Sequence, residues 1–424
     1  MTTSGRYPAL LVGLLLAGSV LSGLDFEVSG KKVRLDQIAS LLMFMHLGLS
    51  AIFGRRGVVL DSPSFCLAAY FVVATYASLS APNPTNSLLQ TGNLATMAMV
   101  YPLLLNYLES PSAIDRCWRM FLTIGGVALA FGLLLYIATL MGYAGQYTPF
   151  SIWVGYGAYG TMREPNIFGG FAAMFVVFSI GLQALGTSRA LRLRRWTRCL
   201  LWVSSSALVL SFTRASWLAV LAVLLPLLVS LRRPVRIKLL LSVSIAALAA
   251  VGIATSPLVP DNYLSYKVSN LFDFQGGTGA GRLSMWMTAL DETAERPWTG
   301  WGTYSFGDTH TDGLKASHEL PWIGNFALTV LHDSGVIGTL CFGLFLLLTL
   351  RRGLADARLF WAHAPEASAR LVGLCYGVLA LLIAFMATTG FSFGYAWIAL
   401  ALIGAHHRCR ASWLPRPRRQ QVAP

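Results

Sequence analysis

The sequence predicts an all-α integral membrane protein with about twelve transmembrane helices, and three observations lead to this prediction. Hydrophobic residues make up 55% of the chain and charged residues only 12%, whereas about 25% of the residues in a soluble protein are charged. The apolar residues lie in long runs and lack the alternation that the strands of a membrane barrel show. A bilayer span needs about 20 mainly apolar residues, and twelve runs approach that length, some of them short.

The apolar runs follow one another along the chain, and one long hydrophilic segment interrupts them. The first run is as long as a signal sequence but lacks a clear cleavage site, so we interpret it as the first helix. The stretch 199–231 is either two spans or one bent hairpin of two short helices with Arg214 at its tip. We therefore predict a single polytopic membrane domain over residues 1–424. The runs are 7–24, 38–53, 64–80, 91–107, 117–142, 166–187, 199–213, 215–231, 239–256, 324–350, 371–389 and 391–406.

The basic residues predict the orientation of these spans. If both termini are cytoplasmic, the cytoplasmic segments contain 23 of the 32 lysine and arginine residues, as the positive-inside rule requires. The largest hydrophilic piece, residues 257–323, is then an outer loop between the ninth and tenth helices. Residues 282–295 within it have the apolar spacing of an amphipathic helix. No basic domain with interleaved aromatic residues lies outside the membrane, so nucleic acid is not an expected partner.

Arg214 is isolated between two apolar runs, within the segment Phe212-Thr213-Arg214-Ala215-Ser216-Trp217. A charged side chain at membrane depth costs at least about 2.5–3.5 kcal/mol, so it normally faces a cavity or a partner. The planar guanidinium of arginine binds phosphate oxygens with two parallel hydrogen bonds. We therefore predict that Arg214 binds an anion, although an arginine that snorkels to the interface is the alternative. Trp217 is either a membrane anchor or a stacking surface for a sugar.

Two further segments on the outer side contain isolated charges. Arg282 follows the glycine-rich run 276–281 at the start of the predicted amphipathic helix, where backbone N–H groups can bind an anion. A flexible linker with a solvated arginine is the alternative. Arg163 and Glu164 precede Pro165 at the start of the sixth span, and they form either a local pair at a helix start or part of the site. In the second case Arg163 joins the anion site and Glu164 serves as a base or polar anchor.

Three histidines on or near the outer side are candidates for a general base. A sugar hydroxyl that attacks a donor can use such a base, and histidine titrates in the right range. His318, which precedes Glu319, is our preferred candidate because it lies just before the chain re-enters the membrane; an ordinary exposed histidine is the alternative. His310 lies earlier in the same loop. His332 with Asp333, about two turns into the tenth span, can equally be a polar packing pair.

Motifs in a fixed order between about Arg163 and Gly338 add to this picture. They are Arg163-Glu164-Pro165-Asn166, Thr213-Arg214-Ala215-Ser216-Trp217, Gly281-Arg282-Leu283-Ser284-Met285-Trp286 and Arg296-Pro297-Trp298-Thr299-Gly300-Trp301-Gly302, followed by Asn325-Phe326-Ala327-Leu328 and Gly335-Val336-Ile337-Gly338. Together they resemble the O-antigen ligase and O-antigen polymerase superfamily of bacterial membrane glycosyltransferases. Gly324 stands where the ligases of this superfamily have a histidine, and this departure favours a polymerase.

The resemblance implies a GT-C-like glycosyltransferase of the bacterial inner membrane that works on the periplasmic face without a metal or a cofactor. The donor would be a glycan on undecaprenyl diphosphate, whose diphosphate Arg214 and Arg282 would bind and stabilise as it leaves. The acceptor would be another lipid-linked repeat unit for a polymerase of O-antigen or exopolysaccharide, or lipid A core for a ligase. A chain-length regulator would be a partner, and a transporter of lipid-linked oligosaccharide is the non-enzymatic alternative. The predicted catalytic residues are Arg214, Arg282, His318, Glu319 and Glu164, and the predicted substrate contacts are Arg163, Asn166, Trp217, Trp286 and Asn325.

Overall fold

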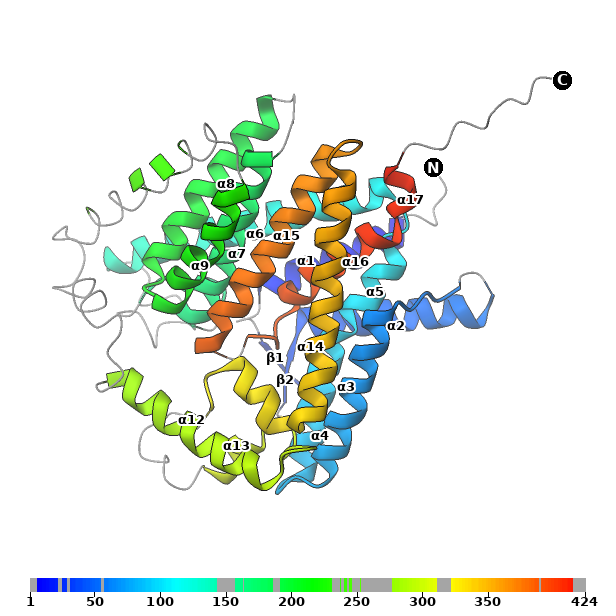
Figure 1. Cartoon of the computed structure of the whole chain (residues 1–424), viewed down its shortest axis with the longest axis vertical. Helices are drawn as coiled ribbons and strands as arrows, with labels where there is room; N and C mark the ends of the chain where they lie inside the picture. Colours follow the sequence, from blue (N-terminus) through cyan, green and yellow to red (C-terminus); the bar gives the residue numbers. More distant parts are fainter. Residues whose placement is uncertain are drawn as a thin grey trace.

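The computed structural model (Figure 1) describes residues 6–21, 25–28, 31–54, 57–142, 157–162, 164–185, 191–230, 277–310, 322–388 and 390–414, with a few more between 237 and 252. These parts are mainly helical, as the sequence predicts. The exception is an antiparallel hairpin of β1 (Asp25–Val28) and β2 (Lys31–Arg34), which the sequence analysis did not anticipate. Seven helices of the described parts are long and apolar enough to cross a membrane. The protein is thus a multi-pass α-helical membrane protein, and the total of twelve spans stays a prediction.

The helices follow the predicted apolar runs, except that most of the ninth run (239–256) lies outside the described residues. The fourth run is longer than expected because α4 and α5 form one span, Pro84–Tyr107. In chain order the helices are α1 (Arg6–Val20), α2 (Leu35–Ile52), α3 (Ser62–Leu79), α4 (Pro84–Ala98), α5 (Val100–Tyr107), α6 (Pro111–Leu140), α7 (Pro165–Leu185), α8 (Leu191–Leu210), α9 (Arg214–Ser230), α12 (Gly277–Glu295), α13 (Ser305–Thr309), α14 (Phe326–Phe360), α15 (Pro365–Ala384), η4 (Phe385–Ala387), α16 (Gly394–Arg408) and α17 (Arg410–Trp413).

Side-chain caps explain where several helices begin. The Asp61 carboxylate accepts a hydrogen bond from Ser64 N at 3.0 Å and starts α3. The Asn325 amide oxygen accepts one from Leu328 N at 3.1 Å and starts α14. Such caps satisfy backbone N–H groups that have no partner within the helix. The start of α14 also sets the position of His332 on this helix, where its ring contacts Glu292 of α12.

The helix α16 lies inside the bundle, packed against α5, α14 and α15 (Figure 1). Its residues from Gly394 to Ala405 are all buried, and Tyr395 and Trp397 are fully enclosed. A helix that is apolar all round, as 394–405 is, can lie in a protein core or face lipid. Its burial and its contacts place α16 in the core, with the other helices packed around it.

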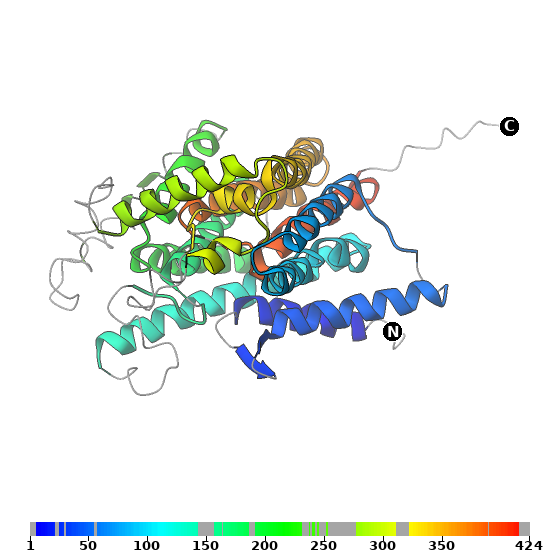
Figure 2. The same cartoon turned by 90° about the horizontal axis from the view of Figure 1, so that it is seen from below.

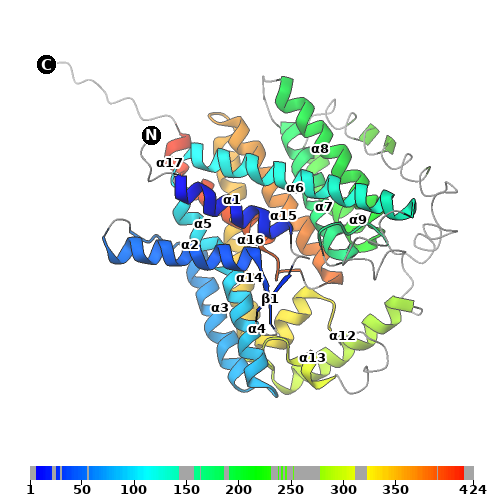
Figure 3. The same ribbon diagram turned by 180° about the vertical axis from the view of Figure 1, so that it is seen from behind.

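Two ion pairs of the predicted cytoplasmic segments lie at the opposite end of the bundle from α12 and α13. At one end Arg352 lies 3.4 Å from Asp61 and Arg370 pairs with Asp115, and both arginines belong to the predicted cytoplasmic segments. At the other end lie α12 and α13, on the opposite side from α17 (Figures 1 and 3). Figure 2 is seen from below and shows α12, in yellow-green, crossing in front of the bundle. The grouping agrees with the predicted alternation of spans, and the side that faces the periplasm stays a prediction.

Candidate functional site

Arg214 is the first residue of α9 and follows a tight turn after α8. In this turn Phe212 has a positive φ of 50°, and the Thr213 hydroxyl donates a hydrogen bond to Pro165 O at 3.0 Å. Gly169 on α7 leaves room for the turn, because a Cβ at that position would lie 2.9 Å from the Thr213 side chain. The stretch 199–231 is thus two helices joined by a tight turn, which is packed on the beginning of α7.

Glu164 lies immediately before α7, which begins at Pro165. Its carboxylate oxygen Oε1 accepts a hydrogen bond from the Thr388 hydroxyl at 2.7 Å. Burial raises the pKa of Glu164, and the Thr388 hydroxyl and the positive charge of Arg282 oppose that rise. The carboxylate therefore lies in a partly desolvated position beside a cation.

Arg282 belongs to the N-terminal half of α12 and is near enough to Glu164 and Arg214 to interact electrostatically with both. Burial lowers the pKa of its guanidinium, Glu164 opposes this effect, and the like charge of Arg214 adds to it. A guanidinium stays charged at any working pH despite such a shift. Two cations and one carboxylate, from three distant segments, therefore share one region at the end of the bundle. This arrangement suits an anion with more than one negative charge.

The two tryptophans among the predicted substrate contacts use their indole N–H groups to fasten helices. Trp217 donates to Leu208 O at 2.8 Å and joins α9 to α8. Trp286 donates to Ile323 O at 2.8 Å and joins α12 to the segment before α14. Both side chains thus have a structural role, and their contact with substrate stays a prediction.

The other predicted site residues lie at helix starts or outside the described residues. Asn325 caps α14, and Asn166 is the second residue of α7. The predicted residues Arg163, His318 and Glu319 lie outside the described residues.

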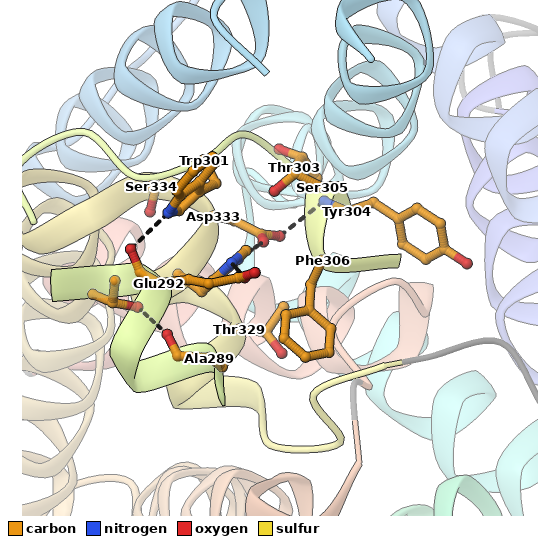
Figure 4. Close-up of polar contacts among 12 residues, drawn as sticks. Ala289, Glu292, Trp301, Thr303, Tyr304, Ser305, Phe306, Thr329, Asp333 and Ser334 are labelled. Atoms are coloured by element: carbon orange, nitrogen blue, oxygen red, sulfur yellow. Dashed lines mark hydrogen bonds and ion pairs between the residues drawn. The ribbon is translucent and has the colours of Figure 1, made fainter. Parts of the chain in front are cut away.

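A second polar cluster, drawn in Figure 4, fastens α12 to α14. The His332 ring is 1% exposed and lies between two carboxylates, with Nε2 2.9 Å from Glu292 and Nδ1 3.1 Å from Asp333. Asp333 also accepts a hydrogen bond from Tyr304 N at 3.0 Å, and Trp301 Nε1 donates to Glu292 O at 2.7 Å. The packing interpretation of His332 and Asp333 is therefore the one that the geometry favours. Glu292 could not be identified from the sequence, because nothing there distinguishes it from the other acidic residues of α12.

The third histidine candidate, His310, lies at the edge of this cluster. Its Nε2 is 3.4 Å from Glu292 Oε1, and its ring stacks on Phe306 with centroids 4.3 Å apart. The side chain is 31% exposed, so unlike His332 it can be reached by solvent. His310 nevertheless belongs to the cluster that holds α12.

The glycine motifs at 296–302 and 335–338 contact each other beside the His332 cluster. Gly335 interrupts α14 with φ 62° and ψ −169°, and Trp301 N donates to His332 O at 2.9 Å across the break. A Cβ at Gly335 would lie 2.4 Å from the Trp298 carbonyl group, and one at Gly300 would lie 2.6 Å from Gly335 N. Only glycine tolerates this backbone conformation and this close approach. The glycines of the two motifs are therefore needed for one joint between residues 297–302 and α14.

The fold and these clusters define a polytopic membrane protein with a basic site at one end of its helices. Residues 199–343 match the family model described as O-antigen ligase, a range that contains Arg214, Arg282 and the glycine joint. The resemblance that the motifs predict is thereby confirmed over this range. No curated protein matches the chain. The match supports a ligase or polymerase function in O-antigen assembly, and hence a membrane glycosyltransferase-like enzyme with lipid-linked glycans as substrates.

Proposed function

We propose that the protein is a polysaccharide polymerase of the bacterial inner membrane. It transfers a growing glycan from undecaprenyl diphosphate to the non-reducing end of another lipid-linked repeat unit on the periplasmic face, without a metal ion. The observation that supports this proposal is the common location of Arg214, Arg282 and Glu164. When the lipid diphosphate leaves, negative charge builds on it, and preorganised cations stabilise that charge in the transition state.

Each charged group has a role in this proposal. Arg214 and Arg282 bind the two phosphates of the donor, and Arg163 is a weaker third ligand. Glu164 is the base candidate with the best structural support, because it lies beside the cations that bind the leaving group. His318 and Glu319 are the other base candidates, and Asn166 follows the Glu164 segment closely enough to contact the same substrate.

Transfer of the glycan to lipid A core is the second candidate function. The family match favours it, since the matching model is described as O-antigen ligase. Gly324 is the observation against it, because this position precedes the α14 cap Asn325 and has φ 63° with no side chain. An acceptor-orienting histidine of the ligases is therefore missing here, and a polymerase is the better proposal.

A gene deletion separates the two reactions. Loss of a polymerase leaves single repeat units attached to lipid A core, whereas loss of a ligase leaves polymer on the carrier lipid. Lipopolysaccharide and carrier-linked glycans are separated on gels, and the deletion strain is then complemented with variants. Single repeat units on core support the polymerase, and stranded polymer supports the ligase.

The arginine role is tested in the same strain with Arg214→Ala and Arg214→Lys. Loss of one group that stabilises the leaving charge costs about 10²–10³ in rate, so Arg214→Ala should give no long chains. Lysine keeps the charge but not the two-pronged geometry, and Arg214→Lys should give short chains. Arg195→Ala, on the exposed face of α8, is the matched control. Normal long chains from both Arg214 variants at normal protein level would contradict the proposal.

A further inference from the structure

Thr388, a residue between α15 and α16, is directed at the charged site from a part of the chain that no site motif covers. Its side chain is fully buried, and its hydroxyl donates to Glu164 Oε1 at 2.7 Å across 224 residues of sequence. Its backbone is extended, with φ −164° and ψ 175°, after the short helix η4. A buried hydroxyl with a carboxylate as its acceptor makes a strong, charge-assisted hydrogen bond.

The segment that follows Thr388 is fastened to the bundle. Trp397 Nε1 donates to Phe391 O at 2.8 Å, and Gly394 N donates to the Asp36 carboxylate at 3.3 Å. Arg34 pairs with Asp36 at 3.1 Å and also donates to the backbone carbonyl of Ser392. The α15–α16 connection therefore lies between fixed points in the core and at the start of α2. It can hold Thr388, and through it Glu164, in one position.

The hydrogen bond engages one of the two oxygen atoms of the carboxylate. Among the described residues, the Glu164 side chain accepts a hydrogen bond from Thr388 through Oε1, and Oε2 has no hydrogen-bond partner. Oε2 is thus the oxygen that a substrate hydroxyl would contact. The carboxylate lies close to Arg282, so this hydroxyl would be close to the bound diphosphate.

We propose, on the basis of the proposed function, that Thr388 is a positioning residue, which holds Glu164 by Oε1 so that Oε2 accepts the proton of the acceptor hydroxyl. The sugar O–H bond breaks and its proton forms the Glu164 carboxyl O–H bond. The sugar oxygen forms a bond to the donor's anomeric carbon. The bond between that carbon and the phosphate oxygen breaks, and its electron pair leaves with the lipid diphosphate. The net charge is unchanged, and no further reactant is needed.

Donor binding prepares Glu164 for this proton. The positive charge of Arg282 favours the ionised form of the Glu164 carboxylate. When a diphosphate binds to Arg214 and Arg282, its negative charges lie near Glu164 and disfavour a second anion there. The proton affinity of the carboxylate therefore rises once the donor is bound. Thr388 keeps the carboxylate in place through this change.

Thr388→Val removes the hydroxyl at almost constant volume, and Thr388→Ser retains it. The assay uses purified protein in nanodiscs, with lipid-linked repeat units from the deletion strain as donor and acceptor. We expect Thr388→Val to lower kcat about 10- to 100-fold, the effect of one hydrogen bond to a charged group, with KM nearly unchanged. The valine variant also loses a hydrogen bond that stabilises the ionised base, so the pKa of Glu164 rises and the acidic limb of the pH–rate profile moves to higher pH. Thr388→Ser should restore both, and Thr75→Val, on the exposed outside of α3, is the control.

Two further variants keep the test decisive. Glu164→Gln should lower kcat about 100-fold or more, and Thr388→Val in that background should cause no further loss, because Thr388 acts through Glu164. Additive losses, or an unshifted acidic limb with normal kcat, would overturn the positioning role. If Thr388→Val does not fold, Thr388→Ala is compared with Thr388→Ser under the same criteria. The failure of the proposed function has another signature, which is normal transfer and normal binding of undecaprenyl diphosphate by Arg214→Ala.

Discussion

Gly335→Ala tests whether the joint between residues 297–302 and α14 keeps α12 in place. The backbone at Gly335, with φ 62° and ψ −169°, is in a region that glycine alone adopts readily, and another residue there costs about 1–3 kcal/mol. The added methyl group would also lie 2.4 Å from the Trp298 carbonyl group, where the backbone must shift. Overpacking of this kind costs about 1–3 kcal/mol. The two effects together predict a loss of about 2–6 kcal/mol in the free energy that holds the joint.

The joint can be measured directly by hydrogen–deuterium exchange of the detergent-purified protein. Faster exchange is expected at residues 297–302 and along α12, together with a lower unfolding temperature and loss of long chains on a gel. Gly343→Ala is the control on the same helix, because a Cβ there meets nothing within 4 Å. This alanine should be neutral or slightly stabilising, by up to about 1 kcal/mol. Wild-type exchange and full-length polymer from Gly335→Ala would refute the reasoning.

Two other substitutions test how the charged site is held. Gly169→Ala should displace the α8–α9 turn from α7, because a Cβ at Gly169 would lie 2.7–2.9 Å from that turn. The polymer should then be shorter at normal protein level. Gly48→Ala is the control, since a Cβ there meets open space, and equally long chains from both variants would contradict the prediction. Glu292→Gln removes the negative charge that pairs with the buried His332 ring and should lower the free energy of unfolding by about 1–2 kcal/mol. The loss should be smaller than that for breaking a fully buried pair, because the Glu292 side chain is 22% exposed. Chemical denaturation checks this value against the exposed neighbour Asp291→Asn, and equal stabilities would exclude a contribution from the pair.

The sequence predicted the helices well but their lengths less well, for one physical reason. Hydropathy measures the apolar length of a segment, whereas a helix continues through charged residues if they find partners. The run 324–350 ends where arginines begin, yet α14 continues to Phe360, and its buried Asp356 contacts His407 at 2.6 Å. In the same way α8 begins at Leu191, within a basic stretch that precedes the apolar run.

The candidate site was partly predictable because isolated charges are rare in an apolar sequence. The sequence distinguishes Arg214 and Arg282 as candidates by their positions alone, and the structure places them within electrostatic range of each other. Thr388 could not be identified in this way, since one threonine among apolar residues has no distinctive pattern. Its link to Glu164 spans 224 residues and exists only because α7 and α15 pack together. Tertiary packing, rather than any local signal, creates that part of the site.

The charge balance of the site connects the leaving group with the base. Among the described residues, the guanidinium groups of Arg214 and Arg282 and the carboxylate of Glu164 carry a combined charge of +1, which favours entry of a diphosphate. In the proposed reaction, negative charge increases on the diphosphate that Arg214 and Arg282 would bind, and a proton moves to Glu164. Each event favours the other, because a neutral Glu164 no longer competes for Arg282 and the growing charge on the diphosphate strengthens the base. A carboxylate in a buried structural ion pair also needs further hydrogen bonds, so the contact with Thr388 fits both roles, and the pH–rate profile of Thr388→Val separates a working base from a structural ion pair.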